Sequence, residues 1–144
     1  MEVSLEDLPD FAKDFIARLP KTPRERAYVV GLRGELGAGK TTFVQELAQV
    51  LGVTNPVTSP TFVIVQTYPI THPSFSRLIH VDAYRLTPEG KDTIGWKEYA
   101  ADPENLILAE WPERLPAGAR ADMILEFLVA GENTRSITEH YENR

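Results

Sequence analysis

The fold of this chain is decided by one stretch, which reads Gly34-Glu35-Leu36-Gly37-Ala38-Gly39-Lys40-Thr41. The stretch matches the pattern Gly-x-x-x-x-Gly-Lys-Ser/Thr in full. Residues 27–32, which precede it, form an apolar run without alternation that predicts a buried strand. A helix is expected over residues 40–51, with Gly52 at its C-terminal cap. The order of strand, glycine-rich loop and helix is typical of a P-loop.

The residue types in this stretch suit phosphate and Mg²⁺. Glycines allow successive N–H groups to converge on an anion at a helix N-terminus. Lys40 would place an ammonium group by the β- and γ-phosphates, and Thr41 would offer a hydroxyl to Mg²⁺. A chance match in a tight glycine turn is the alternative, and the flanking strand and helix disfavour it. The predicted nucleotide contacts in and beside the loop are Glu35, Leu36, Gly37, Ala38, Gly39, Lys40, Thr41 and Thr42.

A magnesium site also needs an acidic residue on a neighbouring strand. The run Leu106-Ile107-Leu108-Ala109 ends in Glu110, so we predict Thr41 and Glu110 as metal ligands. The alternative is a glutamate at a strand end that faces solvent. Trp111 follows directly and belongs either to the core or to the nucleotide pocket, and its adjacency to Glu110 favours the pocket.

A third set of polar residues lies on the expected strand over residues 78–86. His80, Asp82 and Tyr84 share one face of it because strand side chains alternate. We expect Asp82 to help hold the hydrated Mg²⁺ or to orient the attacking water, and His80 to be structural. Hydrogen bonding of all three to loops is the alternative.

The Ser/Thr/Pro segment over residues 58–62 lies between the loop's helix and the next strand. Switch loops occupy this place in nucleotide-hydrolysing proteins, where a threonine hydroxyl senses the γ-phosphate. Thr61 is therefore a candidate catalytic residue. An ordinary polar loop is an equal alternative.

The remaining periodicity predicts an α/β fold in a single domain, residues 1–144. We expect the three-layer sandwich of P-loop NTPases, with a mostly parallel central sheet, additional antiparallel strands and flanking helices. The further expected helices cover residues 4–19, with Ser4 as N-cap, and a segment starting at Thr87-Pro88 and interrupted by Gly90 and Gly95. The further expected strands cover residues 62–68, 105–110, 123–129 and 136–140.

Composition restricts the function classes. The chain has 15 basic and 21 acidic residues and a net charge of −6, which disfavours autonomous DNA or RNA binding. It has no cysteine, so thiol catalysis and cysteine zinc sites are excluded. No apolar run reaches the roughly 20 residues of a membrane helix, and the acidic start is unlike a signal peptide. We expect a cytoplasmic protein that does not bind membranes.

Four motifs occur together and in order. The P-loop is followed by Ser59-Pro60-Thr61-Phe62, then by His80-x-Asp82-x-Tyr84-Arg85, and then by Glu110-Trp111-Pro112-Glu113. Over nearly its whole length the chain resembles the TsaE family of bacterial P-loop ATPases, formerly called YjeE. The glutamate in place of the usual Walker-B aspartate is itself the pattern of that family.

This resemblance implies a role in making threonylcarbamoyladenosine at position 37 of tRNAs that read codons beginning with A. It implies that ATP hydrolysis supports turnover by a TsaB–TsaD heterodimer, so that tRNA is met only through that complex. By matching position, Lys40 would contact phosphate, and Thr41 and Glu110 would bind Mg²⁺. Asp82 would assist the chemistry, while Trp111 would lie near the nucleotide; Thr61 belongs to the switch-like loop.

Three functions stay open on the residues alone. The first is an ATPase that is slow by itself and activated by partners, since neither Arg33 nor Arg85 has a decisive context as an arginine finger. The second is a module whose docking depends on nucleotide but not on hydrolysis. The third is a small-molecule kinase, which the absence of arginine from residues 88–104 disfavours. A GTPase is disfavoured because no Asn-Lys-x-Asp motif is present.

Overall fold

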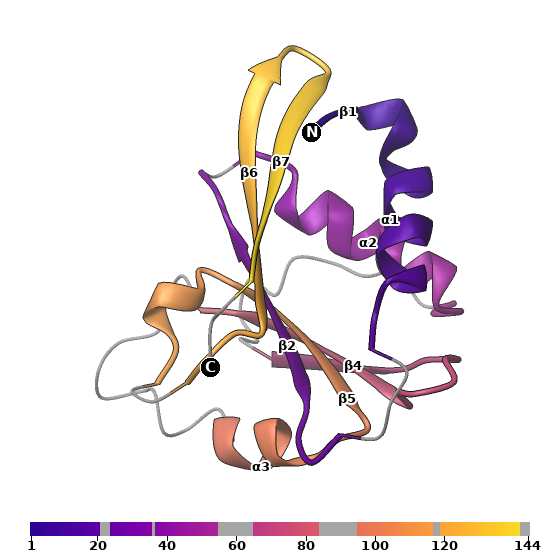
Figure 1. The fold of residues 1–144 in the computed structure, drawn as a ribbon, viewed down its shortest axis with the longest axis vertical. Helices are drawn as coiled ribbons and strands as arrows, with labels where there is room; N and C mark the ends of the chain where they lie inside the picture. Colours follow the sequence, from indigo (N-terminus) through magenta and orange to yellow (C-terminus); the bar gives the residue numbers. More distant parts are fainter. Residues whose placement is uncertain (21–23, 36, 55–64, 84–94, 117–118, 142–144) are drawn as a thin grey trace.

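The structure is a computed structural model, and it describes residues 1–20, 24–35, 37–54, 65–83, 95–116 and 119–141. Seven strands form one sheet in the order β1-β7-β6-β2-β5-β4-β3 (Figure 1). The strands are β1 (Glu2–Ser4), β2 (Tyr28–Arg33), β3 (Val65–Pro69), β4 (Arg77–Asp82), β5 (Asn105–Glu110), β6 (Met123–Gly131) and β7 (Thr134–Tyr141). The helices are α1 (Leu8–Ala17), α2 (Lys40–Val50) and α3 (Trp96–Ala101), with short 3-10 turns η1 (Leu5–Asp7) and η3 (Pro112–Arg114).

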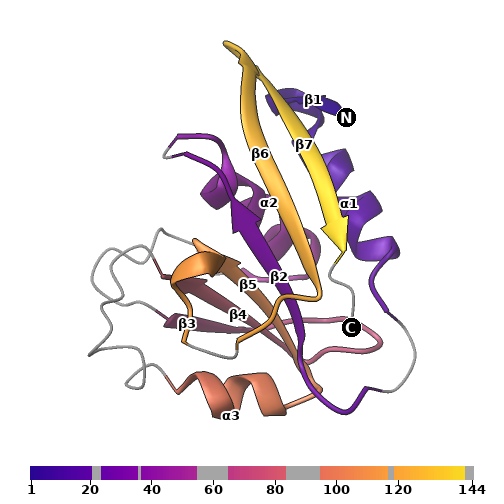
Figure 2. The same cartoon turned by 60° about the vertical axis from the view of Figure 1, so that its left-hand side comes forward.

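The middle of the sheet is parallel. Strand β2 pairs in parallel with both β5 and β6, and β4 pairs in parallel with β5. The antiparallel strands lie outside this centre, with β3 on β4, β7 on β6 and β1 on β7. The prediction of a mostly parallel central sheet with additional antiparallel strands is confirmed. The sheet is strongly twisted, as its right-handed strand twist requires, so β6 and β7 run steeply across the direction of β4 (Figures 1 and 2).

Helices α1 and α2 cover one face of the sheet. Phe43 of α2 is fully buried and touches three other aromatic rings, with centroid distances of 5.7 Å to Phe11, 5.5 Å to Phe15 and 5.7 Å to Phe127. Such tilted and edge-on pairs are the favoured aromatic geometries. This cluster ties α2 to both α1 and β6, and so fixes the helix that begins directly after the glycine-rich loop.

The opposite face carries α3. Trp96, its first residue, belongs to a second core. This core also contains residues from alternate positions of β2, β4 and β5, among them Val29, Ile79 and Ile107. Because consecutive strand residues point to opposite faces, the near-continuous apolar runs of β2 and β5 serve both cores. Helices therefore lie on both faces of the described sheet.

The N-terminal segment differs from its prediction. A helix was expected from Ser4, but Glu2–Ser4 pairs with β7, a 3-10 turn follows, and α1 begins only at Leu8. The cap itself is present, since the Ser4 hydroxyl accepts a hydrogen bond of 3.1 Å from the Asp7 amide. Helical periodicity of apolar residues could not reveal a strand whose partner lies more than 100 residues away.

Most other boundaries follow the predictions closely, but β4 ends at Asp82 although a strand was expected as far as residue 86. Strand β5 has the expected bounds, and the strands near the C-terminus extend slightly beyond theirs. The start of the helix expected at Thr87-Pro88 lies outside the described residues, and α3 begins after Gly95, whose φ is +75°. Within the described ranges, no helix is long and apolar enough to cross a membrane.

Candidate functional site

The glycine-rich loop lies where three parallel strands end. In the sheet register Leu32 of β2 pairs with Glu110 of β5, and Glu110 pairs with Asp82 of β4. The loop leaves β2 just beyond Leu32 and enters α2 at Lys40. The carboxyl ends of parallel strands are the usual place for ligands in α/β sheets. The topology thus brings the two predicted acids, Asp82 and Glu110, to the carboxyl ends of the parallel strands, where the loop begins.

The loop backbone depends on glycine at defined positions. Gly39 caps α2 with a φ of +99°, a left-handed conformation that favours glycine. At Gly34 a Cβ would lie 2.6 Å from the carbonyl oxygen of Phe127, so a side chain would collide with β6. Within the loop, the Ala38 amide donates to the Glu35 carbonyl at 3.1 Å. The chain therefore turns tightly into the positive end of the α2 dipole, an arrangement that suits an anion.

Lys40 is buried in spite of its charge, with 4% of its surface exposed. Its ammonium group donates to the Gly34 carbonyl and lies 4.0 Å from the centroid of the Trp111 ring. Burial lowers the pKa of Lys40, and the carboxylates of Glu110, Asp82 and Glu113 oppose that shift. The loop and the ring thus hold a desolvated cation beside the helix N-terminus.

Next to that cation is a polar cluster formed by Glu110, His80 and the partly buried Thr41. The Thr41 hydroxyl lies 3.2 Å from both carboxylate oxygens of Glu110, to which it donates. His80 Nε2 lies 2.6 Å from Glu110 Oε2, a hydrogen-bonding distance. His80 is fully buried and Glu110 is 4% exposed. A hydroxyl from the helix and an imidazole from β4 therefore aim the Glu110 carboxylate at the start of α2.

Trp111 turns the chain sharply after β5. Its φ of 59° and ψ of 58° are left-handed, and among the described residues it is the one non-glycine residue with positive φ. Its amide donates to the Leu32 carbonyl at 3.2 Å, which anchors the turn to β2. Such a backbone is uncommon for a bulky residue and often marks a functional site. Here it places the indole ring over Lys40.

The other predicted residues are placed as follows. Asp82 is half-buried at the end of β4, and its carboxylate acts electrostatically on Lys40. Glu35, Gly37 and Thr42 are exposed around the loop, and Ala38 is buried. Arg33 faces Glu113 at 3.9 Å. The predictions for Leu36, Thr61, Tyr84 and Arg85 lie outside the described residues.

Sequence reasoning missed two contacts of this site. His80 was expected to be structural, and no local pattern indicates that it bonds to Glu110, 30 positions away. Arg135 on β7 donates to the carbonyl of Ala38 in the loop, across 97 positions. Neither contact has a sequence signal, because each depends on how distant strands are ordered in the sheet.

The oxygens of Thr41 and Glu110 fit a hard cation whose remaining ligands are phosphate and water. In the part of the chain that the structure describes, no group of three or more His, Cys, Asp or Glu could hold a metal by itself. A hydroxyl and one carboxylate are instead present together, at a helix N-terminus. Mg²⁺ commonly binds in this way, through one or two protein oxygens with phosphates and waters as the remaining ligands.

Fold and site together define a mixed α/β protein with a glycine-rich loop and a buried acid at the ends of its parallel strands. A model of the family described as "Threonylcarbamoyl adenosine biosynthesis protein TsaE" matches residues 3–137. The chain belongs to the TsaE family.

Relatives of known name agree with this assignment. The tRNA threonylcarbamoyladenosine biosynthesis protein TsaE of Aquifex aeolicus (strain VF5) is 40% identical over 140 residues, 94% of this chain and 92% of that protein. Its counterpart from Bacillus subtilis (strain 168) is 37% identical over 127 residues, 85% of this chain and 75% of that protein. The crystal structure of Bacillus subtilis YdiB superposes with a TM-score of 0.62 at 29% identity, over 96% of this chain and 83% of that one.

Proposed function

We propose that this protein binds and hydrolyses ATP with Mg²⁺ in the biosynthesis of tRNA threonylcarbamoyladenosine, on a P-loop NTPase fold. The observation that carries the proposal is the contact of the Thr41 hydroxyl with the Glu110 carboxylate. It joins the last residue of the glycine-rich motif to the acid at the end of the neighbouring parallel strand. These are the two protein oxygens that a nucleotide-bound Mg²⁺ requires.

Each residue of the site has a defined task under this proposal. The loop amides and Lys40 would bind the phosphates, and Thr41 and Glu110 would hold the metal, which neutralises charge on the phosphates. Asp82 would orient the attacking water from the end of β4. Lys40 already lies desolvated among carboxylates, so its charge would act on phosphate at low dielectric.

The biological partners in this proposal come from the family. The TsaB–TsaD heterodimer would carry out threonylcarbamoylation of adenosine 37, and this protein would meet tRNA only through that complex, in the cytoplasm. Hydrolysis would be slow without the partners. The net charge of −6 agrees with an indirect encounter with tRNA.

The test has two stages. ATP and GTP binding are measured with Mg²⁺ and with EDTA, and we expect Mg²⁺-dependent binding that prefers ATP. Phosphate release and tRNA modification are then measured with and without TsaB and TsaD. Faster phosphate release in the complex, and product beyond one turnover only with this protein, support the proposal. Tighter GTP binding, or modification that does not depend on this protein, would overturn it.

The same assay separates the two alternatives. If Asp82→Ala still binds ATP and multi-turnover modification continues without phosphate release, the protein acts as a nucleotide-dependent docking module. If a phosphorylated small molecule forms and no free phosphate appears, it is a kinase.

A further inference from the structure

The side chain of Arg135 reaches from β7 to the glycine-rich loop. Its Nε donates to the carbonyl of Ala38 at 3.2 Å, and its Nη2 lies 3.5 Å from the carbonyl of Gly37. The stem of the same side chain passes Gly39, where a Cβ would lie 3.9 Å from Arg135 Cγ. The loop is thus in contact with a residue almost 100 positions further along the chain.

The other side of the guanidinium is held by the turn between β6 and β7. Its Nη1 donates to the carbonyls of Gly131 at 3.3 Å and Thr134 at 3.1 Å. Strand β7 is itself held on both sides at this level, where Arg135 pairs with Val129 of β6 and with Val3 of β1. The guanidinium is therefore a fixed donor that links the turn to the loop.

These contacts determine where the loop amides point. In a trans peptide unit the N–H points opposite to the preceding C=O, and no described peptide bond is cis. With the Ala38 carbonyl bound to Arg135, the N–H of Gly39 points away from β7. The peptide unit between Gly37 and Ala38 is held at both ends. Its Gly37 carbonyl faces Arg135, and its Ala38 amide donates to the Glu35 carbonyl. A loop that binds an anion through its amides must keep its carbonyls turned away in this manner.

Arginine suits this task and lysine does not. The planar guanidinium offers five donors in a fixed fork, so it can bind loop and turn carbonyls at the same time. An ammonium group at the same place would retain the charge but would not span both sets of acceptors. Replacing this arginine with lysine therefore separates the effect of the guanidinium's several donors from the effect of its charge.

We propose that Arg135 is a positioning residue for phosphate binding, which pre-orients the Gly39 amide by holding the carbonyl of Ala38. The inference rests on the proposed function, since it assigns the ligand of the loop to the phosphates of a nucleotide. It adds that the turn between β6 and β7 supports the nucleotide site, although it lies outside the predicted motifs.

The experiment compares Arg135→Met and Arg135→Lys with the wild-type protein. Affinity for ATP and ADP is measured with Mg²⁺, and kcat is measured at saturating ATP. Loss of a charge-assisted hydrogen bond predicts that Arg135→Met binds both nucleotides about tenfold more weakly. We expect kcat to stay within about twofold of wild type, and Arg135→Lys to recover only part of the affinity. Glu139→Gln is the control, because it removes a contact of the same strand to Arg18 and none to the loop.

Hydrogen exchange at Ala38, whose amide donates to the Glu35 carbonyl at 3.1 Å, supplies a readout that needs no nucleotide. We expect faster exchange of this amide in both Arg135 variants and none of that change in Glu139→Gln. If Arg135→Met does not fold, Arg135→Lys carries both measurements. Wild-type affinity in Arg135→Lys would mean that charge alone suffices, and a loss of kcat at unchanged affinity would mean a catalytic group; either result overturns the inference. If the wild-type protein binds no nucleotide but exchange still responds, the proposed function fails and the positioning of the loop stands.

Discussion

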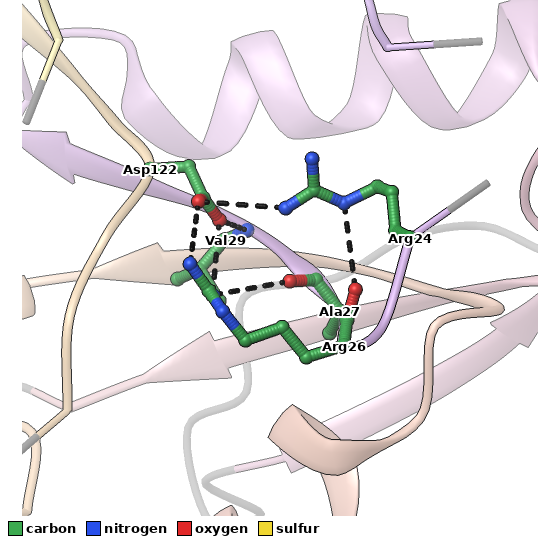
Figure 3. A network of polar contacts seen from close by, with 5 residues as sticks. All are labelled: Arg24, Arg26, Ala27, Val29 and Asp122. Carbon is green, nitrogen blue, oxygen red and sulfur yellow. Dashed lines mark hydrogen bonds and ion pairs between the residues drawn. The ribbon is translucent and has the colours of Figure 1, made fainter. Parts of the chain in front are cut away.

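Two carboxylates lie at opposite ends of β2 and have different surroundings: Glu110 is buried and Asp122 is partly buried. Asp122, before β6, accepts the Val29 amide at 2.8 Å and forms ion pairs with Arg26 at 3.0 Å and Arg24 at 3.5 Å (Figure 3). Glu110, at the end of β5, accepts a hydrogen bond from the Thr41 hydroxyl and lies 2.6 Å from the imidazole of His80. Among the described residues it forms no hydrogen bond to lysine or arginine.

The difference concerns how negative charge is compensated. A partly buried carboxylate with two guanidinium partners and a backbone amide is already neutralised and satisfied, so it stabilises the fold. Glu110 is held by polar groups, and the Lys40 ammonium acts on it electrostatically without a hydrogen bond, so its oxygens keep the capacity to bind a further cation. We therefore interpret Asp122 as structural and Glu110 as a cation ligand, and substitutions can test this contrast.

The largest effect is expected for Glu110→Gln. The amide keeps the size of the side chain but removes the charge, so Mg²⁺-dependent ATP hydrolysis should fall by about 100-fold or more while the fold is retained. Phosphate release and a Mg²⁺ titration of nucleotide binding measure this. Glu113→Gln is the matched control, because it removes an exposed charge near Lys40 without touching Thr41. Equal losses in both variants would contradict a ligand role for Glu110.

The second effect concerns Asp122→Asn and should appear in stability. The substitution removes the negative charge that both Arg24 and Arg26 contact, which should reduce the free energy of unfolding by about 2 kcal/mol. Urea denaturation measures the loss. Nucleotide affinity of the folded variant should match the wild type, because Asp122 contacts the start of β2 and the loop follows the end of that strand. Weaker nucleotide binding by the folded variant would end the contrast between the two carboxylates.

The third effect tests the orientation of Glu110 by His80. His80→Phe has a similar shape but no donor, and it should weaken Mg²⁺-dependent nucleotide binding by about tenfold. His80→Gln can still donate and should recover part of the loss. If Phe and Gln behave alike while both fold, the hydrogen bond to Glu110 has no role in cation binding.

The smallest effect is expected at a surface ion pair remote from both carboxylates. Arg18 Nη2 lies 2.6 Å from Glu139 Oε1, with side chains 40% and 22% exposed, so Glu139→Gln should cost only about 0.5 kcal/mol. The hydrogen bond from Arg18 lowers the pKa of Glu139 below its ordinary value of 4.5. The contribution is therefore present above pH 4.5 and is lost as the pH falls through the lowered pKa. Urea denaturation of both proteins at neutral and acidic pH measures this, and a difference that grows with acid would contradict it.

The sequence predicted those parts of the fold that local pattern determines. Strand β5 was placed with the correct bounds because its apolar run is continuous, and α2 because the loop and Gly52 delimit it. Strand β1 was missed, since its three residues pair with β7 from the other end of the chain. Within the site, Thr41 and Glu110 were predicted as a pair and do lie in contact. The contacts of His80 and Arg135 could not be predicted, because they arise from the order of strands in the sheet.

The left-handed turn at Trp111 gives the protein an optical reporter. Its indole ring lies 4.0 Å from the Lys40 ammonium, so any ligand that draws this lysine away changes the surroundings of the ring. The chain has one other tryptophan, Trp96, which is buried in the core under α3. Trp96→Phe would leave a single tryptophan, and its fluorescence would follow occupancy of the loop without any attached dye.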